Sequence, residues 1–305
     1  YKRINGLFCT WLGRKEVDDL VDQVIGQEAA SIIVRKAAEQ RRHMIMVGEP
    51  GTGKSMLARS MTEFLPKEQL EDILVYRNHE DENEPRIRTV PAGRGSSIIS
   101  ERRAQIKQQR ERTNRTLLFI ALVVGAALLL ATISSGEMLT FIFGSFLLVF
   151  GYFFLRTRLN AGEEGNIPKL LVKHERNEEV PFIDATGTLA GALLGDVRHD
   201  PFQSGADLAT PAHERVEPGA VHRANKGVLY IDEIRMLRME EQQALLVAMQ
   251  EKALSISGRS ERSSGALTKS EPVPTDFILI AAGNLDSVQN MHPALRSRIR
   301  GYGYE

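Results

Sequence analysis

Residues 48–55 of this 305-residue chain read Gly-Glu-Pro-Gly-Thr-Gly-Lys-Ser, a glycine-rich loop that ends in lysine and serine. A loop of the pattern G-x-x-x-x-G-K-[S/T] turns its backbone N–H groups toward phosphate oxygens. The residues before it, 44–47, are Met-Ile-Met-Val and are typical of a buried parallel strand. Apolar residues at helical spacing follow the loop, from Leu57 to Leu65. This order of strand, loop and helix predicts an α/β fold around a parallel sheet.

The loop itself predicts a site for a nucleotide with Mg²⁺, that is, for ATP or ADP. Lys54 is expected to reach the β- and γ-phosphate oxygens, and the Ser55 hydroxyl to ligate Mg²⁺. The helix that begins here places its positive end at the phosphates. A chance match in a glycine-rich loop is the alternative interpretation. The candidate nucleotide-binding residues of the loop are Gly48, Glu49, Pro50, Gly51, Thr52, Gly53, Lys54 and Ser55.

A second apolar segment ends in two acids, as a magnesium-dependent site requires. Residues 228–233 read Val-Leu-Tyr-Ile-Asp-Glu. We expect Asp232 to hold the Mg²⁺ shell and Glu233 to act as the general base for water. The alternative is a strand that ends in ordinary solvated acids.

Two further segments contain candidate catalytic side chains. Residues 277–282 are a third buried-strand candidate, and Asn284 follows it where an amide could orient water beside the γ-phosphate. An asparagine after glycine is also a common turn residue. Downstream, Arg296, Arg298 and Arg300 occupy alternate positions. They form either a solvated charged face or a source of the arginine that phosphoryl transfer often uses.

Two uncharged apolar runs, 117–133 and 138–155, interrupt this pattern. Each run would span roughly 27 Å as a helix, close to the hydrocarbon thickness of a bilayer. They therefore predict a transmembrane hairpin that contacts the lipid bilayer through residues 117–155. A helical hairpin buried in a soluble core is the alternative.

The charges beside these runs predict their orientation. Residues 101–115 contain six Lys/Arg, and Arg156 and Arg158 follow the second run, whereas the turn between the runs has Glu137 and no basic residue. The positive-inside rule places both basic flanks in the cytoplasm. We expect a multi-pass protein of the cell membrane whose remaining sequence forms a domain on the cytoplasmic side.

Composition narrows the remaining function classes. The chain has 39 Lys+Arg and 39 Asp+Glu, so bulk charge gives no reason to expect nucleic acid as a required partner. Its single cysteine, Cys9, excludes a disulfide framework or a four-cysteine zinc site within the chain and is expected to be a passive thiol.

The motifs, taken in order, resemble those of a known family. The segments 48–55, 229–233, 281–284 and 293–298 resemble the ordered motif set of AAA+ ATPases. Further segments resemble the archaeal, membrane-anchored branch of the Lon proteases. One is the apolar hairpin, which lies between the phosphate loop and the acid pair. The others are the box at 22–27, residues 191–201 and 212–215, and a β-hairpin insertion at 254–275.

This resemblance implies roles for individual residues. Asn284 would be the first sensor, and Arg298 the arginine finger offered to a neighbouring subunit, with Arg300 a weaker candidate. Ile25 and Gly26 would lie near the adenine base. The family assembles as rings, which implies a homo-hexamer, and Phe202 is the pore-loop candidate.

The resemblance also implies a function and a domain division. It implies the ATP-hydrolysing motor of a protease that unfolds protein substrates and threads them to a Ser-Lys peptidase domain. Only seven residues follow Arg298, so we expect the peptidase domain and the helical lid to lie outside this chain. The alternatives are a non-proteolytic AAA+ motor, such as a chelatase or MoxR-like chaperone, and a membrane scaffold with an inactive nucleotide site. The expected fold is a three-layer α/β domain divided as follows: lead-in 1–21, first core part 22–100, basic helix with hairpin 101–168, and second core part 169–305.

Overall fold

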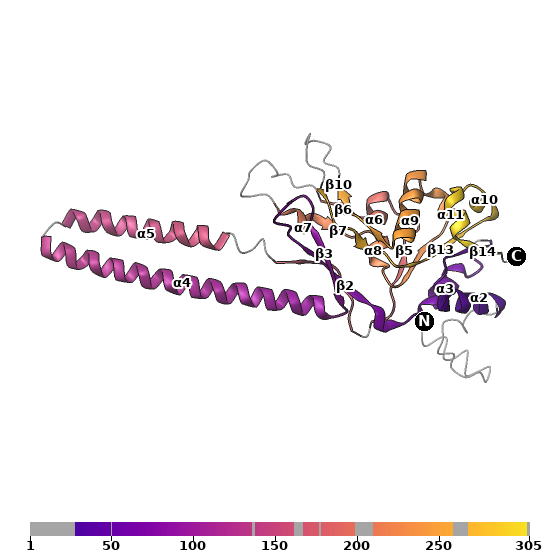
Figure 1. The fold of residues 1–305 in the computed structure, drawn as a ribbon, viewed down its shortest axis with the longest axis horizontal. Helices are drawn as coiled ribbons and strands as arrows, with labels where there is room; N and C mark the ends of the chain where they lie inside the picture. Colours follow the sequence, from indigo (N-terminus) through magenta and orange to yellow (C-terminus); the bar gives the residue numbers. More distant parts are fainter. Residues whose placement is uncertain are drawn as a thin grey trace.

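The computed structural model describes residues 28–49, 51–135, 138–161, 167–176, 178–198, 210–258 and 268–303. An α/β body and a long arm of two helices make up the described part of the chain (Figure 1). We call the body around the parallel sheet the core unit, and helices α4 (Arg94–Ser135) and α5 (Met138–Ala161) the arm.

A five-stranded parallel sheet forms the centre of the core unit, in the order β14-β1-β13-β8-β5. Its strands are β1 (Met44–Val47), β5 (Phe182–Asp184), β8 (Val228–Ile231), β13 (Ile278–Gly283) and β14 (Arg300–Gly303). Three of these strands, β1, β8 and β13, coincide within about one or two residues with those expected from the sequence. The parallel sheet predicted from the glycine-rich loop is confirmed.

Helices cover both faces of this sheet because its buried residues alternate between two apolar clusters. Met44 and Met46 of β1 point into one cluster and Ile45 into the other, as the period of two in a strand requires. The first cluster includes residues of α2 (Glu28–Glu39) and α3 (Lys54–Ser60). The second includes residues of α6 (Ala190–Leu194), α8 (Ala220–Arg223), α9 (Met239–Glu251) and α11 (Pro293–Arg298). The core unit is therefore a three-layer α/β structure. Single 3₁₀ turns lie at Met61–Phe64, Lys67–Gln69 and Ile234–Met236, and α10 (Leu285–Gln289) follows β13.

A second, antiparallel sheet lies beside the core unit, in the order β3-β2-β4. Its strands are β2 (Glu71–Tyr76), β3 (Arg86–Pro91) and β4 (Lys169–Val172). Its apolar cluster includes Ile73, Val75 and Leu171, and Ile256 and Val273 pack into the same cluster. The chain between α3 and β5 therefore forms this sheet as well as the arm. Strands β2 and β3 lie within 22–100, the range expected to form the first core part, but they do not join the parallel sheet.

Short antiparallel pairs complete the body. The described part of the insertion expected at 254–275 contains two such pairs, β9 with β12 at its base and β10 with β11 further along. The short elements are β6 (Asp196–Val197) with β7 (Val216–Glu217), β9 (Ala253–Leu254) with β12 (Val273–Pro274), β10 (Ser257–Gly258) with β11 (Thr268–Lys269), and the helix α7 (Ala212–Arg215).

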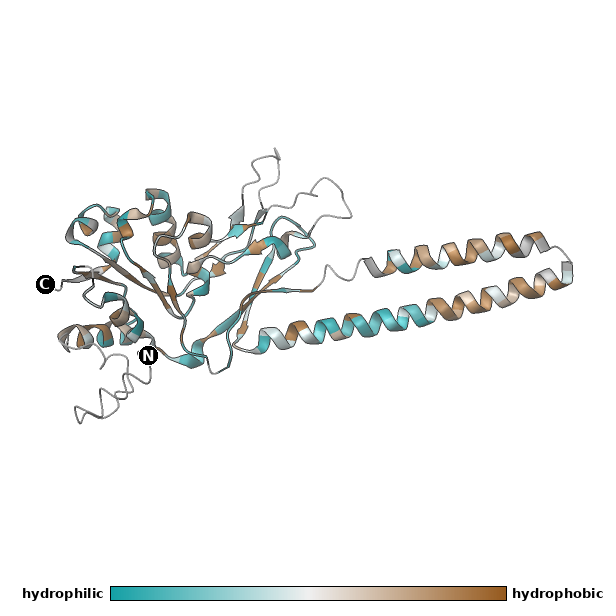
Figure 2. Ribbon diagram, turned by 180° about the vertical axis from the view of Figure 1, so that it is seen from behind, coloured by the Kyte–Doolittle hydropathy of each residue, from teal (hydrophilic) through white to brown (hydrophobic). Residues whose placement is uncertain are grey.

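The arm extends away from the body as two helices that pack side by side (Figure 1). The part of α4 near the body is hydrophilic, and the far parts of both helices are hydrophobic (Figure 2). By length and composition both helices could cross a membrane, and the most apolar stretch of each is not buried in the protein. Phe119, Leu122, Phe146 and Leu147, for example, are 64–72% exposed. The alternative of a hairpin buried in the core is therefore wrong.

The first helix of the arm is anchored to the antiparallel sheet through a buried carboxylate. Gly95 N–H donates to Asp72 Oδ2 at 2.8 Å, and His174 N–H donates to Asp72 Oδ1 at 2.8 Å. A side chain at position 95 would collide with Leu170, because a Cβ built there lies 2.7 Å from its Cδ1. A negative charge at a helix N-terminus is favourable. The start of α4 is thereby held against β2 and β4.

Candidate functional site

Three predicted motifs meet at one edge of the parallel sheet. The residues Val47 and Gly283 are register partners at the ends of β1 and β13, and Ala281 of β13 pairs with Ile231 at the end of β8. The loop 48–55 follows β1, Asn284 follows β13, and Asp232 follows β8. Because β13 lies between the other two strands, Asn284 emerges between the glycine-rich loop and the acids. Ligand sites of open α/β sheets lie at this carboxyl edge.

The glycine-rich loop has the backbone that its sequence requires. Gly51 and Gly53 have φ angles of 85° and 80°, in the region that favours glycine. Chain neighbours aside, no described atom lies within 4 Å of a Cβ built at either position, so the described surroundings leave both glycines open. Gly48 N–H donates to the Gly283 carbonyl at 3.3 Å and ties the loop to β13. Helix α3 begins at Lys54, directly after this turn.

The Lys54 ammonium group lies against the carbonyls of its own loop. Its Nζ donates to Gly48 O at 2.8 Å and to Glu49 O at 2.7 Å. Thr52 Oγ1 also donates to Glu49 O, at 2.9 Å. These contacts hold the cation above the start of α3, where Ser55, the second residue of the helix, is exposed. A phosphate group held there would meet a cation and the first N–H groups of the helix.

The two acids after β8 differ in their surroundings. Asp232 N–H donates to Thr186 Oγ1 at 2.9 Å, and Asp232 Oδ1 accepts from Glu233 N–H at 2.9 Å. Glu233 has a φ of 51°, a left-handed conformation that is rare for a side chain of this size. Its carboxylate forms an ion pair with Arg235 Nε at 3.2 Å. The Asp232 carboxylate therefore contacts the backbone N–H of Glu233, whereas the Glu233 carboxylate contacts Arg235.

Sequence analysis missed three residues that contact or neighbour these acids: Thr186, Arg235 and Asp184. Asp184 ends β5 and is the register partner of Tyr230, so it lies on the strand next to Asp232. Burial raises the pKa of the Tyr230 hydroxyl, and the charges of Asp232 and Asp184 raise it further. Asp184 follows an apolar pair at the end of its strand, as Asp232 does, and this repetition could have identified it.

The candidate arginine lies at the opposite edge of the sheet from the loop of its own chain. Arg298 ends α11 and is exposed. It precedes β14, whose first residue, Arg300, pairs with Met44 at the start of β1. The glycine-rich loop follows the other end of β1. The length of β1, about 10 Å, therefore separates the loop from the edge at which Arg298 lies. The structure thus brings Lys54, Asp232 and Asn284 to one edge and leaves Arg298 apart.

The Arg298 charge lies near His43, at this same edge of the sheet. His43 comes directly before β1, and its Nδ1 accepts a hydrogen bond from Leu279 N–H at 3.0 Å. Burial lowers the pKa of His43 to about 4, and the Arg298 charge is the next contribution in the same direction. A neutral histidine is the form that can accept this bond.

Other predicted site residues lie outside the described part of the chain: Ile25, Gly26, Pro50 and Phe202. Among the residues that are described, no group of three or more His, Cys, Asp or Glu could hold a metal ion. A Mg²⁺ ion held by Ser55 and Asp232 would therefore take its other ligands from phosphate and water, which Mg²⁺ commonly does.

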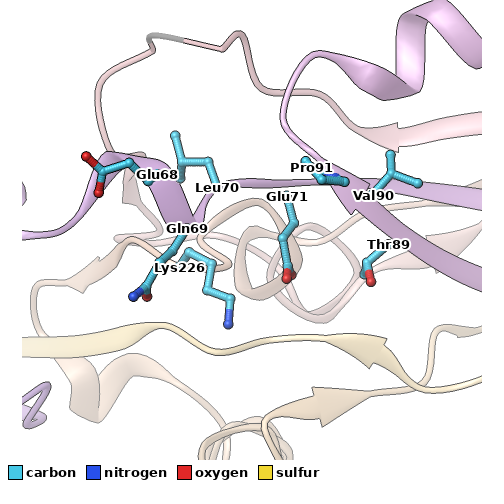
Figure 3. A pocket seen from close by; sticks show the side chains of 8 residues that line it. All are labelled: Glu68, Gln69, Leu70, Glu71, Thr89, Val90, Pro91 and Lys226. Atoms are coloured by element: carbon cyan, nitrogen blue, oxygen red, sulfur yellow. The ribbon is translucent and has the colours of Figure 1, made fainter.

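A separate cleft of about 270 Å³ lies away from these motifs (Figure 3). It lies where β2 and β3 of the antiparallel sheet approach the turn before β8, at the opposite edge of the core sheet from the glycine-rich loop. Its cation, Lys226, is already bound by Asp276, with Nζ donating to Oδ2 at 3.0 Å. The cleft is lined by Glu68, Gln69, Leu70, Glu71, Thr89, Val90, Pro91 and Lys226.

Two family models match parts of the chain. Residues 19–88 match the model described as magnesium chelatase, subunit ChlI, and residues 202–296 match the one described as Sigma-54 interaction domain. Solved structures give weaker likenesses. The BchI–BchD complex of magnesium chelatase covers 40% of this chain and 34% of that chain, at 25% identity and a TM-score of 0.29. NtrX from Brucella abortus covers 92% of this chain and 36% of that chain, at 13% identity and a TM-score of 0.37. Both scores are too low to support an argument.

The curated relatives match nearly the whole chain. A protein named Archaeal Lon protease from Thermoplasma acidophilum is 57% identical over 291 residues, which cover 94% of this chain and 44% of the relative. Proteins of the same name from Thermococcus kodakarensis and Methanocaldococcus jannaschii are 55% and 33% identical, over 94% and 92% of this chain and 44% and 45% of each relative. The chain thus spans less than half the length of these three relatives.

The match to these relatives covers nearly the whole of this chain, and with it nearly all of the features described above. A parallel sheet with a phosphate loop after β1 and an acid pair after β8 forms a P-loop domain of the AAA+ type. The chain therefore corresponds to the AAA+ ATPase part of the archaeal Lon proteases.

Proposed function

We propose that this chain is the ATP-hydrolysing motor of a membrane-anchored, ATP-dependent protease, which unfolds protein substrates and passes them to a Ser-Lys peptidase domain. The observation that carries the proposal is the meeting of the loop 48–55, Asp232, Glu233 and Asn284 at one edge of the sheet. The identity of 57% to a protein named Archaeal Lon protease supports the protease assignment.

In this proposal ATP lies on the loop, with its phosphates at the start of α3. Lys54 exchanges the carbonyls of Gly48 and Glu49 for phosphate oxygens, a gain because a charge-assisted hydrogen bond to an anion is stronger than one to a carbonyl. Mg²⁺, held by Ser55 and Asp232, would supply charge neutralisation at the phosphates. Asn284 orients water from the strand between the loop and the acids.

Glu233 is the general base of the proposed reaction. Its ion pair with Arg235 joins two partly exposed side chains, 33% and 48% accessible. A pair in this setting is worth about 0–1 kcal/mol, so Glu233 can leave Arg235 and turn toward the attacking water at little cost. Arg235 then serves to hold the carboxylate aside when no water is positioned.

Assembly and membrane attachment belong to the same proposal. Because Arg298 is exposed and lies about 10 Å of strand away from its own loop, we assign it to the nucleotide of a neighbouring subunit in a homo-hexamer. The exposed apolar stretches of α4 and α5 would cross the cell membrane, with the core unit in the cytoplasm. Unfolded or misfolded proteins would be the substrates.

A non-proteolytic AAA+ motor is the second candidate, since residues 19–88 match the chelatase model. That match ends at residue 88, whereas the Lon relatives match 94% of the chain. Full-length protein in liposomes decides between the two. ATP-dependent release of peptides from an unfolded protein such as casein supports the protease, and ATP hydrolysis without peptide release supports the other motor. Absence of ATP hydrolysis would leave only a scaffold.

The residue roles make a direct prediction for the full-length protein. Glu233→Gln should retain ATP binding and lower turnover by about 10²-fold or more, because only the proton acceptor is lost. Lys54→Ala should weaken ATP binding itself, because the phosphates lose their cation. Nucleotide binding by fluorescence and phosphate release measure the two effects. Glu240→Gln, at an exposed position of α9, is the control and should change neither. Equal loss of binding in both variants would contradict the assigned roles.

A further inference from the structure

The arm contains a cleft of about 370 Å³ between its two helices, on the border between their hydrophilic and hydrophobic parts. This volume falls within the ~300–1,000 Å³ of small-molecule sites. Its lining residues come from one stripe of α4 and one of α5: Asn114, Arg115, Leu118, Phe119, Leu122, Tyr152 and Arg156.

One end of the cleft is basic and polar. Arg115 lies two residues before the first apolar run and Arg156 directly after the second, and both line the same cleft, so they lie at the same level of the arm. Within the described part of the chain, neither guanidinium has an acidic partner within 4 Å. The Asn114 amide oxygen is buried and has no hydrogen-bond partner among the described residues. The two cations suit an anionic group, whereas the amide oxygen, an acceptor, suits a hydroxyl or N–H donor of the same ligand.

The other end of the cleft is apolar. Leu118, Phe119 and Leu122 are 51–67% exposed, and the ring of Tyr152 lies opposite them on α5. From Arg115 to Leu122, α4 rises about 10 Å, so the apolar wall continues directly from the basic end. A ligand that fills the cleft needs a negatively charged head joined to a hydrocarbon chain.

We propose that this cleft binds one anionic phospholipid, with its phosphate between Arg115 and Arg156 and the first part of one chain along Leu118, Phe119 and Leu122. Guanidinium groups bind phosphate oxygens in pairs, and basic residues just cytoplasmic of a membrane helix attract anionic lipids. The inference rests on the proposed membrane insertion of residues 117–155.

The test uses full-length protein in a non-ionic detergent, incubated with equal amounts of phosphatidylglycerol and phosphatidylcholine that have identical chains. Native mass spectrometry counts each lipid retained per subunit. Wild-type protein should retain phosphatidylglycerol in preference. Arg115→Gln with Arg156→Gln should lower that retention roughly tenfold, since two charged contacts to phosphate are lost.

The matched control is Arg112→Gln with Arg158→Gln, which removes the same charge from the same two helices. Neither residue lines the cleft, and the Arg158 guanidinium lies 6.0 Å from the centre of the Phe154 ring. This pair should retain phosphatidylglycerol as wild type does. Equal losses in both pairs would mean diffuse charge attraction and would overturn the proposal.

A third variant separates a lipid from a free anion. Leu118→Ala with Phe119→Ala should also lower phosphatidylglycerol retention, and excess inorganic phosphate should not displace the lipid. Unchanged retention in this variant, or displacement by inorganic phosphate, would show an anion site only and overturn the proposal. Unchanged lipid counts in the Arg115/Arg156 variant together with an altered subunit number would assign the cleft to subunit contact instead.

Fractionation of the same cells distinguishes this test from the test of the proposed function. Recovery of wild-type protein in the soluble fraction would contradict membrane anchoring. Recovery in the membrane fraction, with active proteolysis and equal lipid counts in all variants, would overturn the lipid site alone.

Discussion

The core unit and the arm use apolar residues in opposite ways. In the core unit, residues such as Ile45, Leu229 and Leu279 are at most 5% exposed and share one cluster, while the residues next to them along each strand lie in the other. In the arm, apolar residues such as Phe119 and Leu147 are consecutive with others of their kind and are 67% and 72% exposed. Alternation with a period of two buries a strand against helices on both sides, whereas a helix apolar on all sides needs a surrounding that is itself apolar.

The two regions also differ in the roles proposed for them, ATP hydrolysis for the core unit and membrane attachment for the arm. Every described residue with a proposed role in ATP hydrolysis belongs to the core unit, and the arm joins the body through the antiparallel sheet. The buried Asp72, which accepts from Gly95 N–H, fixes the start of α4. The polar part of α4 before Leu117 is about 34 Å long, so it would hold the core unit away from a membrane surface.

The largest effect on ATP hydrolysis is expected when the core unit loses the arginine proposed to act on the nucleotide of a neighbouring subunit. Arg298→Ala should bind ATP normally but hydrolyse it about 10³-fold more slowly, because the γ-phosphate loses the cation that a neighbouring subunit offers. Arg296→Ala, two residues earlier and also exposed on α11, is the matched control and should retain activity. Phosphate release by purified full-length protein gives both rates.

A mixture of inactive variants tests whether the arginine acts between subunits. Rings that combine Arg298→Ala and Lys54→Ala subunits contain some sites with an intact loop and an intact neighbouring arginine. Phosphate release above that of both parents is expected. If mass measurement demonstrates mixed rings and activity does not rise, Arg298 acts within its own subunit or has a structural role.

Deleting the apolar part of the arm, residues 117–155, should have a smaller effect on the core unit. Arg115 and Arg156 line one cleft, so the helices are adjacent at this level, and packed helices lie about 8–10 Å apart. A short Gly/Ser linker in place of residues 117–155 can therefore bridge them. The variant should move from the membrane fraction to the soluble fraction and keep its affinity for ATP.

Two outcomes would contradict the view that the core unit folds independently and that lipid covers the arm. Loss of ATP binding would mean that the core unit depends on the arm for its fold. Soluble behaviour of the unmodified protein would mean that the exposed apolar surface is covered by something other than lipid. Cell fractionation and nucleotide binding by the same preparations provide both measurements.

Local pattern was sufficient to predict β1, β8 and β13, because a parallel strand buried on both faces reads as a short apolar run. It was also sufficient to predict the arm, because two uncharged runs have few structural interpretations. The antiparallel sheet was not foreseen, since the pairing of β2 with β4 joins residues about a hundred positions apart. The acidic loop at 80–85, between β2 and β3, was the available signal for the first half of that sheet.

The sequence was sufficient to identify the motif residues of the candidate site but not the residues that contact them. Lys54, Ser55, Asp232, Glu233 and Asn284 follow from residue type and spacing, yet their contacts come from segments that fold beside them. The Thr186 hydroxyl that accepts from Asp232 N–H is 46 positions away. The position of Arg298 at the far edge of the sheet depends on the pairing of β14 with β1, which no local pattern shows.

The smallest expected effect is a pH dependence that belongs to the core unit alone. His222 is fully buried, its Nδ1 accepts from Gly219 N–H at 3.2 Å, and its Nε2 lies 3.1 Å from the Leu254 carbonyl. Burial lowers the pKa of His222 to about 4, partly opposed by the Leu254 contact. An unfolded histidine has a pKa of about 6.5. The unfolded state therefore binds the extra proton between pH 6.5 and 4, and stability falls as the pH falls through this range.

For His222 this loss is on the order of 2 kcal/mol at pH 5 relative to pH 7, and His43, whose pKa is also about 4, should contribute a similar amount. Amide hydrogen exchange measures this loss. After correction for intrinsic rates, exchange in β8 and β13 should accelerate toward pH 5. Exchange in α4 and α5 should not, because the arm contains no histidine. His222→Gln retains an acceptor and a donor and should remove about half of the slope, whereas His79→Gln, at an exposed position, should remove none. An equal response of the arm would show that the two regions unfold together and that the division between them is not thermodynamic.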